Sequence, residues 1–82
     1  MRRSPFAIRL GRGIQEARVA AHKTPAQAAR YMRRSEAWYT MLEAGRSVIL
    51  VGDFFSLLRF FKADSCELLI RAHGAKRRPT RR

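Results

Sequence analysis

The stretch that decides the fold is RRSEAWYTMLEAGR, residues 33–46, which encodes one short helix between arginines. Ser35 at its start is a residue type that caps helices, and Gly45 is a type that ends them. At about 100° per residue, one side of this helix is apolar and is expected to be buried. That side is formed by Tyr39 and Leu42, with Trp38 at its flank. The opposite side is formed by Ala37, Thr40, Met41 and Ala44, with Glu36 at its upper edge.

Helix signals recur on both sides of this stretch. Ser4-Pro5 is a cap followed by proline at the first helical position, and residues 24–27, TPAQ, read as a capping box. Residues 51–61 carry apolar side chains at helical spacing, and residues 64–67, DSCE, open a last helix that stops at Gly74. Strand alternation and internal repeats are missing from the sequence. The pattern therefore predicts an all-α domain of five short helices.

The first and fourth of these helices carry unusual residues. Gly11 and Gly13 each cost about 1 kcal/mol against alanine inside a helix, so we expect weak first turns there. In the fourth helix, helical spacing predicts a core stripe of Val51, Phe54, Phe55, Leu58 and Phe61. Five more apolar residues precede this stripe or lie beside it: Val48, Ile49, Leu50, Leu57 and Phe60. They either pad a small core or form a dimer interface.

The positive charge is concentrated at the two ends of the chain. The 82 residues carry a net charge of +12, with four arginines in residues 1–12 and five basic residues in 75–82. Residues 13–74 hold nine basic and six acidic residues, a balance of +3. We therefore divide the chain into a basic arm (1–3), a helical domain (4–74) and a basic tail (75–82). Such ends attract polyanions, of which nucleic-acid phosphates are the most common.

The composition argues against several functional classes. Cys66 is the only cysteine and His22 and His73 are the only histidines, so no metal cluster or nucleophile–base pair is expected. We expect neither an enzyme nor a bound cofactor. No apolar run approaches the roughly 20 residues that span a bilayer, and no membrane partner is expected. A single thiol suits a reducing cytoplasm, so we expect a cytoplasmic, nucleoid-associated protein.

Three segments in one ungapped register resemble the Xre family, the Cro- and lambda-repressor-like DNA-binding domains. Residues 10–18, LGRGIQEAR, are similar to the family's I-G-x-x-I-R-x-L-R, and residues 24–29 stand where it has S-Q-x-x-L-A. Residues 43–46, EAGR, stand where it has E-x-G-K/R, and the register continues to Leu69. The resemblance implies a lambda-repressor-like helix-turn-helix domain. It also implies a partly buried ion pair between Arg18 and Glu43.

In this family the helix at 35–44 reads the major groove. Its outward face suits thymine methyl groups and one cytosine amino group, and it lacks a bidentate reader of guanine or adenine. The expected base contacts are Glu36, Ala37, Thr40 and Met41. The expected backbone contacts, through side chains or helix N-terminal amides, are Ala26, Gln27, Arg33, Arg34, Ser35 and Arg46.

Two departures from the family pattern lie near this helix. Pro25 stands where a glutamine often contacts a phosphate, so that contact is lost. Arg33-Arg34 replaces the usual Gly-Val of the turn. If Arg33 keeps the left-handed conformation of the glycine, it carries a strain of roughly 1 kcal/mol. Arg34 replaces a half-buried apolar residue and is expected to reach solvent along its stem.

The resemblance implies a transcriptional regulator, Cro-like or a repressor of a bacterium, phage or mobile element. We expect it to bind double-stranded operator DNA, an inverted repeat, as a homodimer. One alternative is an antitoxin that also binds a toxin, favoured by an exposed apolar segment at 48–51. Another is an adaptor for a partner such as an antiactivator-type protein, on a fold that no longer reads DNA. A third is a nucleic-acid binder without sequence preference, driven by the basic ends.

Overall fold

The computed structural model describes residues 5–73, apart from the side chains of Ser65, Cys66 and Arg71. Five helices make up this part of the chain: α1 (Pro5–Ala20), α2 (Pro25–Met32), α3 (Glu36–Glu43), α4 (Val51–Phe61) and α5 (Ser65–Ala72). No strand occurs in residues 5–73, and the predicted all-α, five-helix class is confirmed. The predicted arm (1–3) and tail (75–82) lie outside the described range. None of the described helices is long and apolar enough to cross a membrane.

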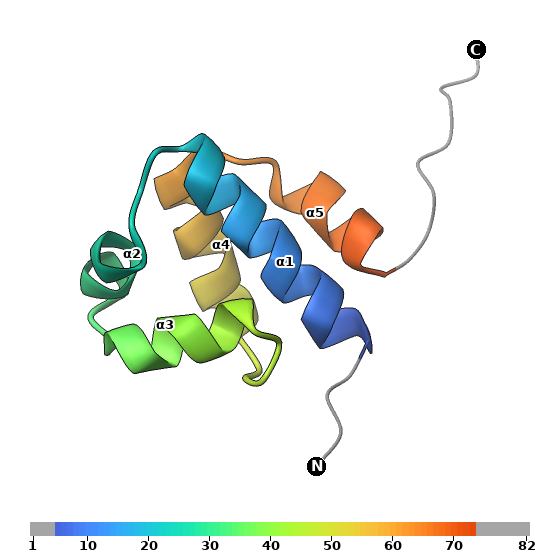
Figure 1. The fold of residues 1–82 in the computed structure, drawn as a ribbon. Helices are drawn as coiled ribbons and strands as arrows, with labels where there is room; N and C mark the ends of the chain where they lie inside the picture. Colours follow the sequence, from blue (N-terminus) through green and yellow to red (C-terminus); the bar gives the residue numbers. More distant parts are fainter. Residues whose placement is uncertain (1–4, 74–82) are drawn as a thin grey trace.

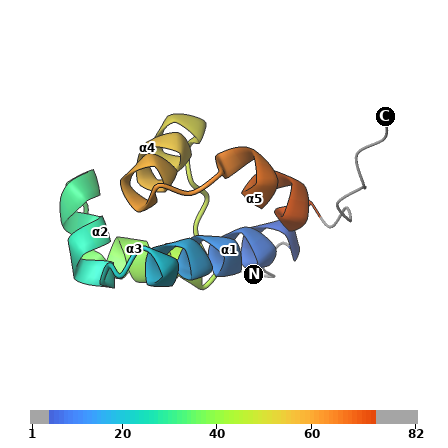
Figure 2. The ribbon, with the colours of Figure 1, turned by 90° about the horizontal axis from the view of Figure 1, so that it is seen from above.

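The helices form two layers closed at one end by α2. Figure 2 shows α1 and α3 along one side of the molecule and α4 and α5 along the other. In Figure 1, α1 runs diagonally across the domain between α3 and α5. Helix α1 packs against α3, α4 and α5, and α2 packs against both α3 and α4. The long first helix thus supports α3, α4 and α5, and α3 is left at the edge of the domain.

The core lies between these layers and includes the predicted inner face of α3. Tyr39 is fully buried and Leu42 is 2% exposed, while Trp38 is half-buried against the core. The largest fully buried side chains come from α1, α3 and α4: Tyr39, Ile14, Leu42, Leu57 and Leu58. The buried face predicted for α3 is therefore confirmed.

The prediction of the core stripe of α4 is wrong for the side that carries Val51 and Phe55. Val51 and Phe55 are 70% and 46% exposed, whereas Leu57, which was placed beside the stripe, is fully buried. The reason is that α1, α2 and α5 all pack against α4, and together they bury the face that carries Leu57. Because Leu57 is inside the core, it is removed from the expected dimer interface. Phe60 is also engaged within the domain, since its ring stacks on that of Tyr31 at a centroid distance of 4.3 Å.

The expected weakness of the first turns of α1 is not observed. The helix runs without interruption from Pro5 through both glycines. A Cβ atom at Gly11 would lie 2.5 Å from the carbonyl oxygen of Glu43 and 2.6 Å from that of Leu42. At Gly13 it would lie 2.9 Å from the Leu68 side chain. The two glycines therefore allow α3 and α5 to approach α1 closely, and this packing offsets their poor helix propensity.

Candidate nucleic-acid interface

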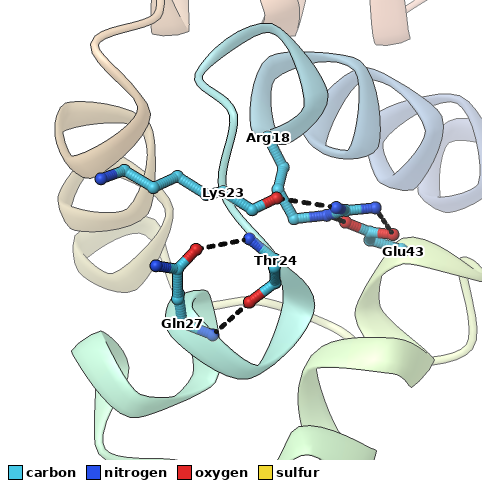
Figure 3. A network of polar contacts seen from close by, with 5 residues as sticks. All are labelled: Arg18, Lys23, Thr24, Gln27 and Glu43. Carbon is cyan, nitrogen blue, oxygen red and sulfur yellow. Dashed lines mark hydrogen bonds and ion pairs between the residues drawn. The ribbon is translucent and has the colours of Figure 1, made fainter.

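The start of α2 is fixed by the capping box that the sequence predicts. The Thr24 hydroxyl accepts a hydrogen bond from the Gln27 amide at 3.1 Å, and the Gln27 side-chain oxygen accepts one from the Thr24 amide at 2.8 Å. Figure 3 shows both bonds at the first turn of the helix. The expected phosphate contact from the Gln27 amide would have to replace or share its bond to Thr24. The Ala26 amide, one residue earlier, has no such competitor among the hydrogen bonds of the box.

The turn between α2 and α3 contains an arginine in the left-handed region. Arg33 has φ 58° and ψ 42°, and its amide donates to the carbonyls of Ala29 and Arg30. The Arg34 amide donates to the Ala29 carbonyl at 2.9 Å, which completes the C-terminal cap of α2. This is the conformation that a glycine would adopt without strain. The family-like turn geometry is therefore kept even though its glycine is absent.

Replacing Arg33 with glycine is expected to stabilise the fold. The substitution removes the left-handed strain, so the free energy of unfolding should rise by about 0.5–1 kcal/mol. Lys62 is a matched control, because it ends α4 with nearly the same angles, φ 57° and ψ 42°. Urea denaturation followed by circular dichroism should show similar gains for Arg33→Gly and Lys62→Gly. A loss of stability in both variants would contradict the strain argument.

A partly buried ion pair joins α1 to the end of α3. Arg18 Nε lies 2.7 Å from Glu43 Oε2, and Arg18 Nη2 lies 3.4 Å from Glu43 Oε1. Both side chains are 12% exposed. Arg18 Nη1 also donates to the Lys23 carbonyl at 2.9 Å, as Figure 3 shows. One guanidinium therefore ties together α1, the loop before α2 and the last residue of α3, which is the pairing that the resemblance implied.

The electrostatics of this pair extend to the core tyrosine. The hydrogen bond to Glu43 raises the pKa of Arg18, so the guanidinium stays charged throughout the accessible pH range. Burial raises the pKa of Tyr39 well above its usual value, and the neighbouring Glu43 carboxylate raises it further. Within residues 5–73, however, the Tyr39 hydroxyl has no partner at hydrogen-bonding distance and angle. Tyr39 thus contributes to this region as a neutral, buried ring.

The outward face of α3 is open to solvent. The Ser35 hydroxyl accepts a hydrogen bond from the Trp38 amide at 3.0 Å and fixes the start of the helix. Met41 is 44% exposed, and the other three expected base-contact residues are exposed as well. The four residues therefore share one accessible face: Glu36, Ala37, Thr40 and Met41.

Arg34 is held by two neighbours that the sequence analysis did not identify. Its Nη2 atom lies 3.0 Å from Asp53 Oδ2 in the first turn of α4, and its guanidinium lies 4.7 Å from the centre of the Trp38 ring. The Arg34 and Asp53 side chains are 42% and 27% exposed. Arg34 is therefore partly neutralised and fixed in place, and any phosphate would share it with Asp53.

Arg30 is a cationic residue near α3 that the sequence analysis missed. It lines an open hollow of about 590 Å³ beside the turn, together with Ala26, Ala29, Arg33, Arg34 and Glu36. The sequence could have identified Arg30, because it lies three residues before Arg33, about one helical turn away. Within residues 5–73, the side chains of Arg30, Arg33 and Arg46 form no ion pair. These exposed cations flank both ends of α3.

The expected dimer residues fall into two groups. Val48 is 89% exposed and Leu50 is 67% exposed, whereas Ile49 packs partly against the core. With Leu57 and Phe60 engaged inside the domain, the exposed apolar surface here is limited to the segment before α4 and its first turns. Val51 and Phe55 extend it, although they had been expected in the core.

The chain is similar in structure to the clp gene regulator ClgR from C. glutamicum. The two superpose with a TM-score of 0.75 and 25% sequence identity, over 84% of this chain and 90% of that chain. No protein-family model and no curated protein matches the sequence. This likeness confirms the helix-turn-helix fold predicted from the sequence, in which α2 and α3 are the two helices joined by the turn at residues 33–35.

Proposed function

We propose that the protein is a DNA-binding transcriptional regulator whose helix α3 reads the major groove of an operator. The observation that carries this proposal is the exposed face of α3, flanked by three cations that have no acidic partner within residues 5–73: Arg30, Arg33 and Arg46. The likeness to a gene regulator of known structure supports the same class of function. We also propose that the protein belongs to the Xre family and acts as a repressor or Cro-like control protein.

In this proposal most of the affinity comes from phosphates. Arginines around the α2–α3 turn and Arg46 after α3 contact the backbone and fix the register of the protein. Met41, Ala37 and the Thr40 methyl contact thymine methyl groups, and Glu36 accepts from a cytosine amino group. Because no described residue of the outward face is a bidentate base reader, base discrimination should be modest.

A homodimer on an inverted repeat is the corresponding assembly. The exposed apolar segment at Val48, Leu50 and Val51 supports it, since burying such residues would stabilise an isologous contact. Two copies of α3 would then enter the major groove about 34 Å apart. The same exposed segment favours the second candidate, an antitoxin on this fold that uses the segment to hold a toxin. Sedimentation of the protein with DNA tests the homodimer, which requires two copies for each operator, whereas a complex with the product of a neighbouring gene would favour the antitoxin.

DNA titrations over a salt series test the proposal. We expect the DNA upstream of its own gene to bind more tightly than random duplex. Arg46→Ala and Arg33→Ala should each weaken binding to both DNA duplexes and lower the slope of log K against log[salt] by about 1. Met41→Ala and Glu36→Ala should change the sequence preference instead, with the slope unchanged. Arg59→Ala, an exposed arginine of α4, is the charge-matched control and should leave the slope unchanged.

Equal binding to both duplexes at every salt concentration would rule out operator recognition and leave a binder without sequence preference. No binding at low salt would rule out the DNA proposal and favour the adaptor. If all variants weakened binding uniformly, the assignment of base-reading residues would be wrong.

A further inference from the structure

A second surface of unusual composition lies on α4, away from α3. It consists of two adjoining hollows of about 550 and 450 Å³ that share Ala63. The first is bounded by the end of α1 and the residues that follow it, and the second by Tyr31 of α2 and the outer side of α4. No residue of α3 lines either hollow, and Figure 2 shows α4 on the side of the molecule opposite α3. A ligand here would leave the outward face of α3 accessible.

The walls of these hollows carry aromatic rings. Tyr31 and Phe55 line the second hollow and are each 46% exposed. Phe60 lines the first, and its ring stacks on Tyr31 at 4.3 Å with an interplanar angle of 15°. The rings of Tyr31 and Phe60 therefore connect the two hollows. Tyr31 and Phe55 are exposed and Phe60 is half-buried, and ordered rings of this kind bury much apolar area on binding at a small loss of side-chain freedom.

The charged side chains that line these two hollows are all positive. Lys23 and Lys62 line the first hollow, and Arg59 lines the second. Among residues 5–73, no carboxylate lines either hollow; Glu16, Asp64 and Glu67 line a separate hollow that shares Ala17 and Ala63 with the first. Lys23 Nζ lies 4.9 Å from the centre of the Phe60 ring, a cation–π contact that keeps the ammonium group beside the aromatic surface. Figure 3 shows this side chain extending toward α4. The cations Arg18 and Arg34, in contrast, are matched by Glu43 and Asp53.

We propose that the two hollows form a docking surface for an acidic segment of a partner protein. Aromatic or aliphatic side chains of that segment would pack against Tyr31, Phe55 and Phe60, and its carboxylates would pair with Lys23, Arg59 and Lys62. This combination of apolar anchors and opposite charge matches both properties of the surface. The inference goes beyond the proposed DNA binding and does not depend on it.

Other occupants match only one of the two properties. DNA would satisfy the cations but would leave the aromatic walls without apolar contacts. A second copy of this chain would bring a net charge of +12 against the same charge. Two of its six carboxylates, Glu43 and Asp53, are already paired within the domain. An acidic partner with apolar anchors is therefore the occupant that the charge pattern selects.

The test is a titration of ¹⁵N-labelled protein with two synthetic peptides, followed by NMR. Each peptide has about 14 residues with leucine or phenylalanine at helical spacing, and the positions between them are glutamate in one and lysine in the other. The glutamate peptide should shift the amide signals of residues 20–23, 31 and 55–63. The lysine peptide should leave these signals in place.

Matched variants locate the contact. Arg59→Glu and Phe55→Ala should each weaken binding of the glutamate peptide by about tenfold or more, since both side chains are exposed and their loss leaves the core intact. Circular dichroism checks that both variants are folded. Arg46→Ala, which should weaken DNA binding, should bind the peptide like the unmodified protein. Failure of the docking proposal is thereby separated from failure of the DNA proposal.

Four results would overturn the proposal. The first is no shift at millimolar glutamate peptide, and the second is equal binding of the lysine peptide. The third is displacement of the glutamate peptide by duplex DNA with shifts of the same residues, which would make this a second nucleic-acid surface. The fourth is a dependence of these signals on protein concentration without peptide, which would identify a second copy as the occupant.

Discussion

Gly11→Ala is expected to lower the free energy of unfolding by about 3 kcal/mol, a large part of the stability of a domain this small. The added methyl group would lie 2.5 and 2.6 Å from two backbone carbonyl oxygens at the end of α3. Backbone atoms at a helix terminus cannot rotate away as a flexible side chain does, so α1 and α3 must separate. Helix α3 would lose part of its packing as a result. Chemical denaturation and a thermal melt followed by circular dichroism measure the effect.

Gly52→Ala is the control for this prediction. Position 52 is also a glycine inside a helix, but a Cβ atom there would meet no atom within 4 Å. Alanine at this site should stabilise the protein by about 0.5 kcal/mol through its better helix propensity. If Gly11→Ala lowers the free energy of unfolding and Gly52→Ala raises it, the role of Gly11 is to allow close contact between α1 and α3. A stabilising Gly11→Ala would contradict the observed approach of α1 and α3.

Glu43→Ala is expected to destabilise the protein by about 2–4 kcal/mol. It leaves the Arg18 guanidinium largely buried and without its carboxylate, and an unpaired buried charge is more costly than the loss of the pair itself. Some of this penalty is relieved because both side chains are 12% exposed. Urea denaturation of Glu43→Ala, Arg18→Ala and the double variant measures the coupling between the two residues.

The double variant decides whether the pair acts as a unit. Removing both charges should destabilise the protein less than the sum of the two single changes, because no unpaired charge remains. Additive losses would mean that the two residues act separately. Arg34→Ala is a useful comparison, since the Arg34–Asp53 pair is more exposed and should contribute less than about 1 kcal/mol.

The sequence predicted features that depend on local chemistry or on spacing within one helix. The caps at Thr24 and Ser35 follow from side-chain oxygens next to helix starts, and the buried side of α3 follows from periodicity. The Arg18–Glu43 contact came from the resemblance, because no local rule links residues so far apart in sequence. The left-handed Arg33 was likewise expected only because the family has a glycine at that position.

Features that depend on neighbouring helices were not predicted. Periodicity indicates that α4 has an apolar side, but it does not say where α1, α2 and α5 touch it, so Leu57 was placed beside the core stripe with a core role and a dimer role both left open. Gly11 was taken as a weakness because its partner, the end of α3, is more than 30 residues away in sequence. The Arg34–Asp53 contact and the cationic hollows on α4 join residues from different segments of the chain and have no signal in any single segment.

The left-handed arginine at position 33 implies a trade-off between folding and binding. Selection for heat resistance alone would favour glycine there, and selection for affinity toward a polyanion would favour a cation. In this chain a cation occupies the strained position at the entrance to the proposed reading helix. Selection for tighter binding of a polyanion and selection for greater thermal stability therefore favour different residues at position 33. A thermostable descendant of this chain would be expected to regain its charge elsewhere on the same surface.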